Sequence, residues 1–330
     1  MKALSIFLFI FLFSLSIPSK PSIRYEDKIR IKEAFLIEQQ FGEKVWKGFT
    51  LPPFPIVLVY DDYEFLINHP KPTDDFIFLE NDSFLGVDVY YRKRTFNKHF
   101  LATFPAVNGF NCIVIGIPEN TNQTSTSWII TLLHERFHQY QYTSKNYYQD
   151  TMDLGISNGD QTGMWQLNYP FPYEDKAVIE KYKAYTNALQ KAVKELNTPQ
   201  FKEYYKLFLK ARKEFKEVLQ PDDYKYFSFQ LYQEGMARYT EYAFLETLKK
   251  YTPTIEVQTI QDFKAFSNYK DSFLTKHINN ITALKLDQQK RVCFYDIGLG
   301  EALLINKVNP NWKDQYLLDK FDIEKFYPKN

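Results

Sequence analysis

The character of the sequence changes once, between residues 118 and 124, and this change restricts the possible folds more than any other feature. Before it, short β-branched and aromatic runs, typical of strands, lie at residues 56–60, 76–79, 86–91 and 112–117. After it, apolar residues recur at helical spacing over residues 125–142, 176–196, 201–219, 222–250 and 294–306. Strands followed by helices, without regular alternation, predict an α+β fold.

The composition is that of a globular protein. The 330 residues are 45% hydrophobic and 25% charged, and 41 Lys and Arg against 40 Asp and Glu give a net charge of +1. A chain so close to neutral lacks the electrostatic signature of a dedicated nucleic-acid binder, and it contains neither a GxGxxG nor a GxxxxGK[ST] phosphate loop. Aromatic residues make up 18% of the chain, so we expect a core built largely from rings.

The first 19 residues have the pattern of a secretory signal peptide. A positively charged start precedes an apolar run from Leu4 to Leu15, and the small residues Ser14 and Ser16 stand before a possible cleavage site. A membrane anchor is the alternative, but the run is shorter than the ~20 residues that cross a bilayer. We therefore expect an exported protein, secreted or periplasmic, with no membrane span in the mature chain.

Residues 20–330 are expected to form a single domain, strand-rich over about 50–120 and mainly helical over 121–330. The chain has two cysteines, Cys112 and Cys293. In an oxidising compartment they could form a disulfide. They could equally remain two separate buried thiols, and the sequence does not distinguish these alternatives.

Residues 134–138 read His-Glu-Arg-Phe-His, which is the pattern H-E-x-x-H. Residues four apart lie on one face of a helix, so the imidazoles of His134 and His138 can both reach one metal ion at about 2 Å. Glu135 projects about 100° further round the helix, where it can accept a proton from a water molecule at the metal. A helix with two hydrogen-bonded histidines is the alternative. It is disfavoured because two of the chain's five histidines flank a glutamate at this spacing.

A catalytic zinc site usually has three protein ligands, and no third histidine is suitably placed. The extended metzincin pattern would require Gly at position 141 and His at 144, where this chain has Gln and Ser. The remaining histidines, His69, His99 and His277, are isolated in the sequence and are expected to be structural or exposed. The third ligand is therefore expected to be a carboxylate.

The segment Glu234-Gly235-Met236-Ala237 supplies the best candidate for that carboxylate. Glu234 would reach the metal from a later helix, and the small Gly235 and Ala237 would let this helix approach the helix of the two histidines closely. Glu241 lies two turns further along the same face. It is the ligand itself, a residue that orients a ligating imidazole, or an exposed residue without a role in the site.

With these residues, the sequence resembles the zincin metallopeptidases, and among them the gluzincin type, whose third ligand is a glutamate on a later helix. It also looks like uncharacterised exported zinc-dependent peptidases. The resemblance implies a zincin-like α+β fold in which a small twisted sheet is followed by a mainly helical lower lobe. It further implies that His134, His138 and Glu234 bind Zn²⁺ and that Glu135 is the general base.

The function expected from this resemblance is zinc-dependent hydrolysis of peptide bonds in a peptide or protein substrate. A zinc hydrolase of a non-peptide amide, from cell wall or lipid, and a metal-binding protein without catalysis are the alternatives. The reaction needs a donor to the oxyanion, and the candidates are Arg238, Tyr239 and Tyr295. The strand predicted to bind an extended substrate by its exposed edge is Asn111–Pro118.

Overall fold

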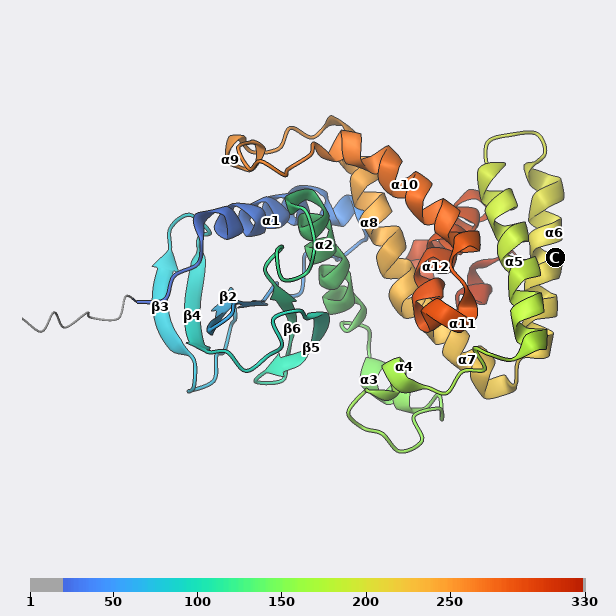
Figure 1. Cartoon of the computed structure of the whole chain (residues 1–330), viewed down its shortest axis with the longest axis horizontal. Coiled ribbons are helices and arrows are strands. Elements are labelled where there is room, and N and C mark those ends of the chain that lie inside the picture. Colours follow the sequence, from blue (N-terminus) through green and yellow to red (C-terminus); the bar gives the residue numbers. More distant parts are fainter. Residues whose placement is uncertain (1–19, 329–330) are drawn as a thin grey trace, which may run out of the picture.

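The computed structural model describes residues 20–328. It contains a six-stranded mixed sheet and a larger helical part (Figure 1), which confirms the predicted α+β class. The predicted signal peptide at residues 1–19 lies outside the described residues. No helix within the described residues has the length and apolar character needed to cross a membrane.

The sheet has the strand order β3-β4-β2-β1-β6-β5. Its strands are β1 (Ile56–Val59), β2 (Tyr63–Ile67), β3 (Ile77–Asp82), β4 (Val87–Lys93), β5 (Leu101–Val107) and β6 (Phe110–Gly116). β1 and β6 are parallel, and every other neighbouring pair is antiparallel. β1, β3, β4 and β6 fall where the sequence predicts strands, whereas β2 and β5 were not predicted.

The position of β5 corrects the prediction for the substrate-binding edge. The predicted edge strand, Asn111–Pro118, corresponds to β6, which lies inside the sheet between β1 and β5. β5 is the edge strand on that side of the sheet, with β3 at the opposite edge, and β5 contains Pro105. Proline has no N–H to donate and is tolerated in a sheet mainly at an edge. Pro105 therefore fits the edge position of β5, although it interrupts the strand pattern in the sequence.

The helical part follows the predicted segments but contains more elements. The helices are α1 (Tyr25–Val45), α2 (Ser125–Gln141), α3 (Tyr147–Met152), α4 (Trp165–Asn168), α5 (Lys176–Lys194), α6 (Phe201–Val218), α7 (Pro221–Gln230), α8 (Met236–Thr247), α9 (Ile255–Gln258), α10 (Phe266–Ala283), α11 (Leu286–Gln289) and α12 (Cys293–Val308). Two of the long helices, α1 and α10, were not predicted. A π-helical turn, η1 (Leu231–Gly235), divides the single helix predicted over 222–250.

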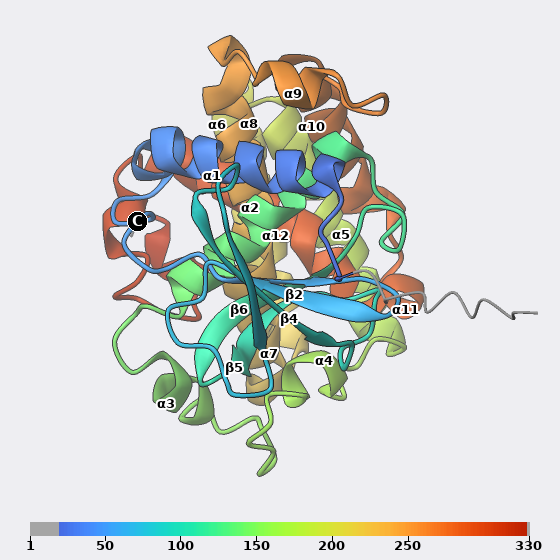
Figure 2. The same ribbon diagram turned by 90° about the vertical axis from the view of Figure 1, so that its left-hand side faces the viewer.

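Both faces of the sheet carry buried apolar side chains, but one face packs into a much larger core than the other. Because strand side chains alternate, Ile56 and Leu58 of β1 join the main core, while Val57 and Val59 belong to a smaller cluster on the other face. Helices α1 and α2 cover the face of the main core, and α1 runs across the sheet (Figure 2). The sheet and α1 therefore form one end of the molecule, and the antiparallel pair α5 and α6 lies at the other end (Figure 1).

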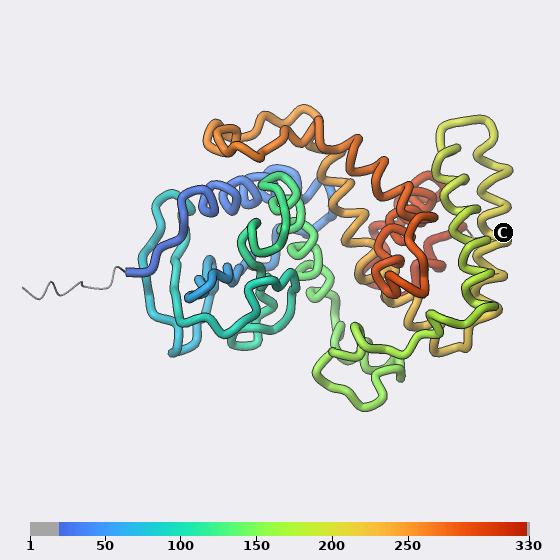
Figure 3. Tube along the Cα trace, in the orientation of Figure 1, coloured from blue at the N-terminus to red at the C-terminus, as the bar shows by residue number. Residues whose placement is uncertain are grey.

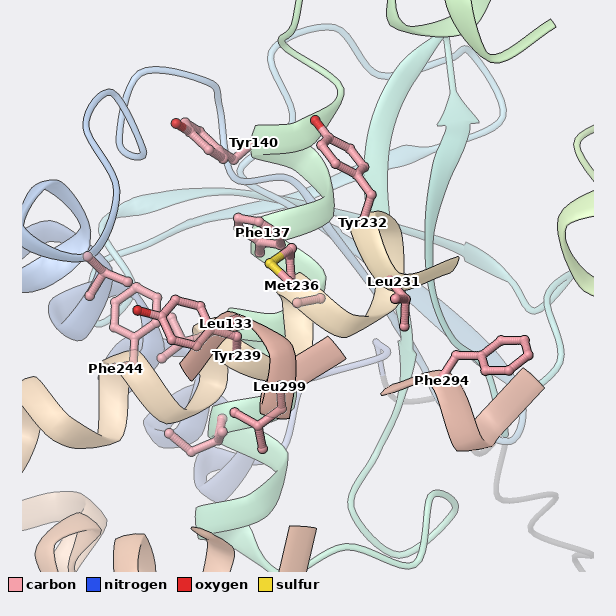
Figure 4. Packing of buried hydrophobic residues seen from close by; sticks show 14 of the residues in the cluster. Leu133, Phe137, Tyr140, Leu231, Tyr232, Met236, Tyr239, Phe244, Phe294 and Leu299 are labelled. Carbon is pink, nitrogen blue, oxygen red and sulfur yellow. The ribbon is translucent and has the colours of Figure 1, made fainter. Parts of the chain in front are cut away.

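Helix α2 connects the two parts of the molecule, because it contacts β5, β6 and α1 on one side and α8 on the other. Its N-cap Thr124 accepts a hydrogen bond from the Ser127 N–H, which satisfies an otherwise unpaired donor. Leu133 and Phe137 of α2 pack with Met236 of α8 in the aromatic-rich core (Figure 4). Beyond α2, the chain runs through the α3–α4 segment before it reaches α5 at the far end (Figure 3).

Both cysteines are free and buried, so the structure has separate thiols in place of a disulfide. Cys112 lies on β6, in the smaller apolar cluster, and its Sγ donates to the Phe110 carbonyl. Cys293 begins α12 in the helical part. Burial raises the pKa of both thiols, that of Cys293 to about 11, so both are protonated and weakly nucleophilic at neutral pH.

Two glycines allow α12 to touch the π-helical turn. A Cβ on Gly298 would lie 2.3 Å from the Cα of Gly235, and a Cβ on Gly235 would lie 2.5 Å from the Cα of Gly298. Any side chain at either position would overlap backbone. Gly235 therefore serves the approach of α12 and not, as the sequence suggested, the approach of the histidine helix.

Gly298→Ala is expected to destabilise the protein by about 1–3 kcal/mol, although alanine is the better helix former by about 0.5–1 kcal/mol. The reason is the overlap with the Gly235 backbone, which only a shift of a whole helix can relieve. Gly300→Ala is the matched control, since its Cβ would meet only the flexible ends of Ile281 and Leu189. Thermal unfolding of both variants checks this, and equal Tm values for the two would contradict it.

Candidate metal centre

Two histidines and a glutamate of α2 form a buried group at the junction of sheet and helices. The residues His134, Glu135 and His138 are 5–6% exposed. One ligand atom from each lies within 4.8 Å of the others, and the group can hold a metal ion. The two imidazole ring centroids are 5.0 Å apart. The i and i+4 positions on one helix face therefore bring the rings together as the motif predicts.

Glu234, from the π-helical turn η1, completes this group. Its Oε2 lies 3.6 Å from His134 Nε2 and 3.5 Å from His138 Nε2. Ligands placed about 2.0–2.1 Å from a tetrahedral ion are about 3.3–3.4 Å apart, whereas a direct N–H···O hydrogen bond would bring the atoms to about 2.7–3.2 Å. The observed spacing thus leaves room for an ion between the three atoms.

The carboxylate of Glu135 is held by the sheet. The Thr103 hydroxyl, on the edge strand β5, donates to Glu135 Oε2 at 2.7 Å, and its oxygen also lies 3.0 Å from the Glu135 carbonyl. Glu234 Oε2 lies 3.5–3.6 Å from both imidazole Nε2 atoms, whereas the Glu135 carboxylate is engaged by Thr103. Glu234 is therefore the candidate for the third ligand.

Both candidate imidazole ligands have an acceptor at the opposite ring nitrogen. His134 Nδ1 lies 2.6 Å from Glu241 Oε1. His138 Nδ1 lies 2.7 Å from Gln141 Oε1, and the more distant Gln233 Nε2 is 3.1 Å from the same nitrogen. When each Nδ1 carries the proton, each Nε2 presents its lone pair toward Glu234. This arrangement of an acceptor behind each imidazole is usual for metal-ligating histidines. Of the three alternatives that the sequence left open for Glu241, the structure shows a buried residue paired with His134.

The charges around His134 favour a cation. Burial by itself would lower the pKa of His134, but the carboxylates of Glu234 and Glu241 outweigh it and raise this pKa to about 9. Burial opposes ionisation of Glu234, yet the two imidazoles hold the pKa of this carboxyl well below its usual range. Arg238 lies 2.9 Å from both oxygens of Glu241 and helps to keep that carboxylate ionised.

No family model, curated protein or solved structure matches the chain. The chemistry of the site is therefore inferred from its own geometry. That geometry consists of three converging ligand atoms, an acceptor behind each imidazole, and a carboxylate held beside them by the edge strand.

The three candidates for the oxyanion donor are placed very differently. The Tyr295 ring, on α12, lies parallel to that of His134 with centroids 6.2 Å apart. Burial and the charge of Glu234 raise the pKa of Tyr295 well above its usual value, so its hydroxyl is protonated at the site. Arg238 is engaged with Glu241, and Tyr239 is buried against Trp46 and Trp312. Tyr295 is therefore the best placed of the three.

The isolated histidines take no part in the group. His69 lies 3.3 Å from the Val107 carbonyl, and His99 contacts the Asn120 carbonyl at the surface. His277 is buried with its Nδ1 2.7 Å from Asp296.

Two residues of the site, Thr103 and Gln141, were not predicted from the sequence. Thr103 was missed because β5 was not recognised as a strand, and Gln141 served only to exclude the metzincin pattern. The polar character of Gln141 on the buried face of α2 was the available signal.

Glu241→Ala is expected to weaken metal binding by about 10- to 100-fold, because it removes the acceptor that orients His134. The ligand atoms themselves would remain. Glu246→Ala is the matched control on the same helix, since Glu246 is half-exposed and pairs with Lys249. Competition with a chelating dye measures both affinities. An affinity of the Glu241 variant equal to that of the control would show that Glu241 does not support the site.

Proposed function

We propose that the protein is an exported zinc-dependent metallopeptidase of the gluzincin type. The observation that carries this proposal is the approach of Glu234 Oε2 to within 3.6 Å of His134 Nε2 and 3.5 Å of His138 Nε2. A helix that packs under a mixed sheet and carries two ligands, with the third ligand on a helix of the other lobe, supports a zincin-like architecture.

The donor set fits zinc. Two imidazoles and one carboxylate are the ligands of many catalytic zinc sites, which keep a further position open. All three candidate ligands belong to the chain, and no thiolate takes part, because Cys112 and Cys293 lie elsewhere. Bound zinc would supply Lewis-acid chemistry by polarising a carbonyl and lowering the pKa of a water molecule.

The protein side chains would move the protons of the reaction. Glu135 takes one proton from the attacking water and delivers it to the leaving nitrogen as the C–N bond breaks. Thr103 keeps the Glu135 carboxylate in place through its 2.7 Å hydrogen bond. The Tyr295 hydroxyl, which remains protonated, donates to the oxygen on which negative charge develops.

The edge strand β5 suggests how a peptide would bind. Within the described residues β5 pairs with β6 on one side and with no strand on the other. An added strand could pair there through backbone groups other than the Thr103 carbonyl, which accepts a hydrogen bond from the Tyr142 hydroxyl. Thr103 joins this strand directly to Glu135. A substrate in extended conformation along β5 would therefore pass next to the general base, and we propose this mode in place of binding along Asn111–Pro118.

Hydrolysis of a non-peptide amide remains the second candidate, since the same residues can attack any amide carbonyl. A metal-binding protein without catalysis is less consistent with the site, because the Glu135 carboxylate is held beside the ligands by Thr103. A metal site without chemistry has no requirement for that contact.

The test combines metal analysis with hydrolysis. Elemental mass spectrometry of the purified mature protein is expected to find about one zinc per chain. The protein is then incubated with an unfolded protein, with peptidoglycan and with N-acyl amides, before and after a chelator and with zinc restored. Chelator-sensitive peptide cleavage would support the proposal, and cleavage of only the other substrates would favour the second candidate. Absence of zinc after supply of the metal would refute both.

A further inference from the structure

Arg291 borders the candidate metal centre and has no role in the proposed reaction. It lies in the 3-10 turn η3 (Lys290–Val292), directly before α12. Its Nη1 donates to the Tyr295 hydroxyl at 3.0 Å and lies 3.9 Å from Glu234 Oε1. Since Glu234 Oε2 faces the imidazoles, the guanidinium approaches the site from the opposite side of this carboxylate.

The charge of Arg291 is only weakly compensated. Arg238, the other arginine near the site, contacts both oxygens of Glu241 at 2.9 Å. Within residues 20–328, Glu234 is the one carboxylate within 4.0 Å of Arg291. A metal ion between Glu234 and the imidazoles would take up the negative charge of Glu234, and Arg291 would then have no anionic partner of its own.

The guanidinium also has unused donors that solvent can reach. The Arg291 side chain is 26% exposed. Within the described part of the chain, its hydrogen bond to Tyr295 is the one that Arg291 makes through its side chain. Arginine carries five N–H donors in a planar fork that matches a carboxylate in bidentate geometry. The free donors therefore suit a carboxylate that enters the site from outside.

The neighbouring Lys290 is differently placed. It is exposed and lines a surface cavity of about 560 Å³ together with the aromatic segment 169–173. Glu174 and Asp175 line the same cavity, so the positive charge of Lys290 is balanced there. A preference of the site for anions would consequently come from Arg291 and not from this cavity.

We infer that Arg291 binds a carboxylate of the substrate beside the scissile bond, an inference that rests on the proposed peptidase function. Arg291 lies 3.9 Å from Glu234 Oε1, while Glu234 Oε2 faces the imidazoles. A carboxylate bound to the guanidinium would therefore lie close to the candidate ligands, and it would belong to a residue near the scissile bond. The source is either the α-carboxylate of a chain end or the side chain of Asp or Glu, and Arg291 determines this specificity.

The test compares matched peptides. One N-acetylated peptide is prepared with a free carboxylate and with a carboxamide at its C-terminus, and a longer amidated peptide is prepared with Glu or Gln at one internal position. The wild-type protein is expected to prefer the carboxylate form of one pair by about 10- to 100-fold in kcat/KM, the usual effect of a charge-assisted hydrogen bond. The pair that shows the preference identifies the source of the carboxylate.

Arg291→Gln is expected to bring the ratio of rates for acid and amide close to one, whereas the matched control Lys290→Gln should keep the wild-type ratio. A wild-type ratio near one in both peptide pairs would overturn the inference and leave the peptidase proposal intact. Loss of zinc in Arg291→Gln would also overturn it, since the role would then be structural.

Absence of peptide cleavage would refute the peptidase proposal. In that case a binding experiment still tests the inference about Arg291. Isothermal titration of zinc-loaded Glu135→Gln protein with the free-acid and carboxamide peptides is expected to show tighter binding of the acid. This difference in affinity should disappear in the double variant that carries both Glu135→Gln and Arg291→Gln. Equal affinities for the two peptides would overturn the inference.

Discussion

Glu234→Ala is expected to reduce bound zinc from about one ion per chain to nearly none. The substitution removes one of three converging ligand atoms, and the two imidazoles that remain belong to a single helix turn. The Glu234 carboxylate also interacts electrostatically with His134, whose pKa it raises. The substitution therefore removes both a ligand atom and a negative charge from the site. Elemental mass spectrometry after dialysis against a weak chelator measures the effect.

Two controls make this result specific. Glu246→Ala, on the exposed side of α8, should retain the wild-type zinc content. Thermal unfolding of metal-free Glu234→Ala should still be cooperative but at a lower Tm than that of the wild type, because the substitution also removes the carboxylate that pairs with the two buried imidazoles. Zinc retained at wild-type affinity in Glu234→Ala would transfer the third-ligand role to another residue.

Glu135→Gln is expected to keep the metal and to lower kcat by about 10²- to 10⁴-fold, the usual contribution of a general base. Glutamine has nearly the same shape and still accepts a hydrogen bond from Thr103, but it cannot take a proton from water. The binding of substrate should change little, so KM is expected to vary far less than kcat. Steady-state kinetics on a peptide that the wild type cleaves, together with zinc analysis, check this.

The comparison of the two variants separates metal binding from chemistry. Glu234→Ala should lose zinc and activity together, while Glu135→Gln should lose activity alone. A Glu135→Gln protein that hydrolyses at the wild-type rate would show that another group is the base. A Glu135→Gln protein without zinc would instead place Glu135 among the ligands, as its position in the buried α2 group allows.

Local patterns in the sequence predicted much of the fold and part of the site. The strands β1, β3, β4 and β6 and the long helices α2, α5, α6 and α12 follow from the periodicity of their apolar residues. The strand β5 was missed because Pro105 interrupts its pattern, and edge strands tolerate such a residue. The helix predicted over 222–250 was right in extent, but its π-helical turn has no recognisable pattern.

The sequence by itself determined which residues of α2 share a face, because helix geometry fixes the relation between positions four apart. His134 and His138 could therefore be grouped without a structure, with Glu135 beside them one position further along the helix. The sequence also named Glu234 as a candidate, but only the tertiary structure shows which distant residues contact this group. Glu234 reaches the imidazoles from η1, nearly a hundred residues away, and Thr103 reaches Glu135 from the sheet edge. Contacts between distant segments depend on how whole helices and strands pack, and no local spacing encodes that packing.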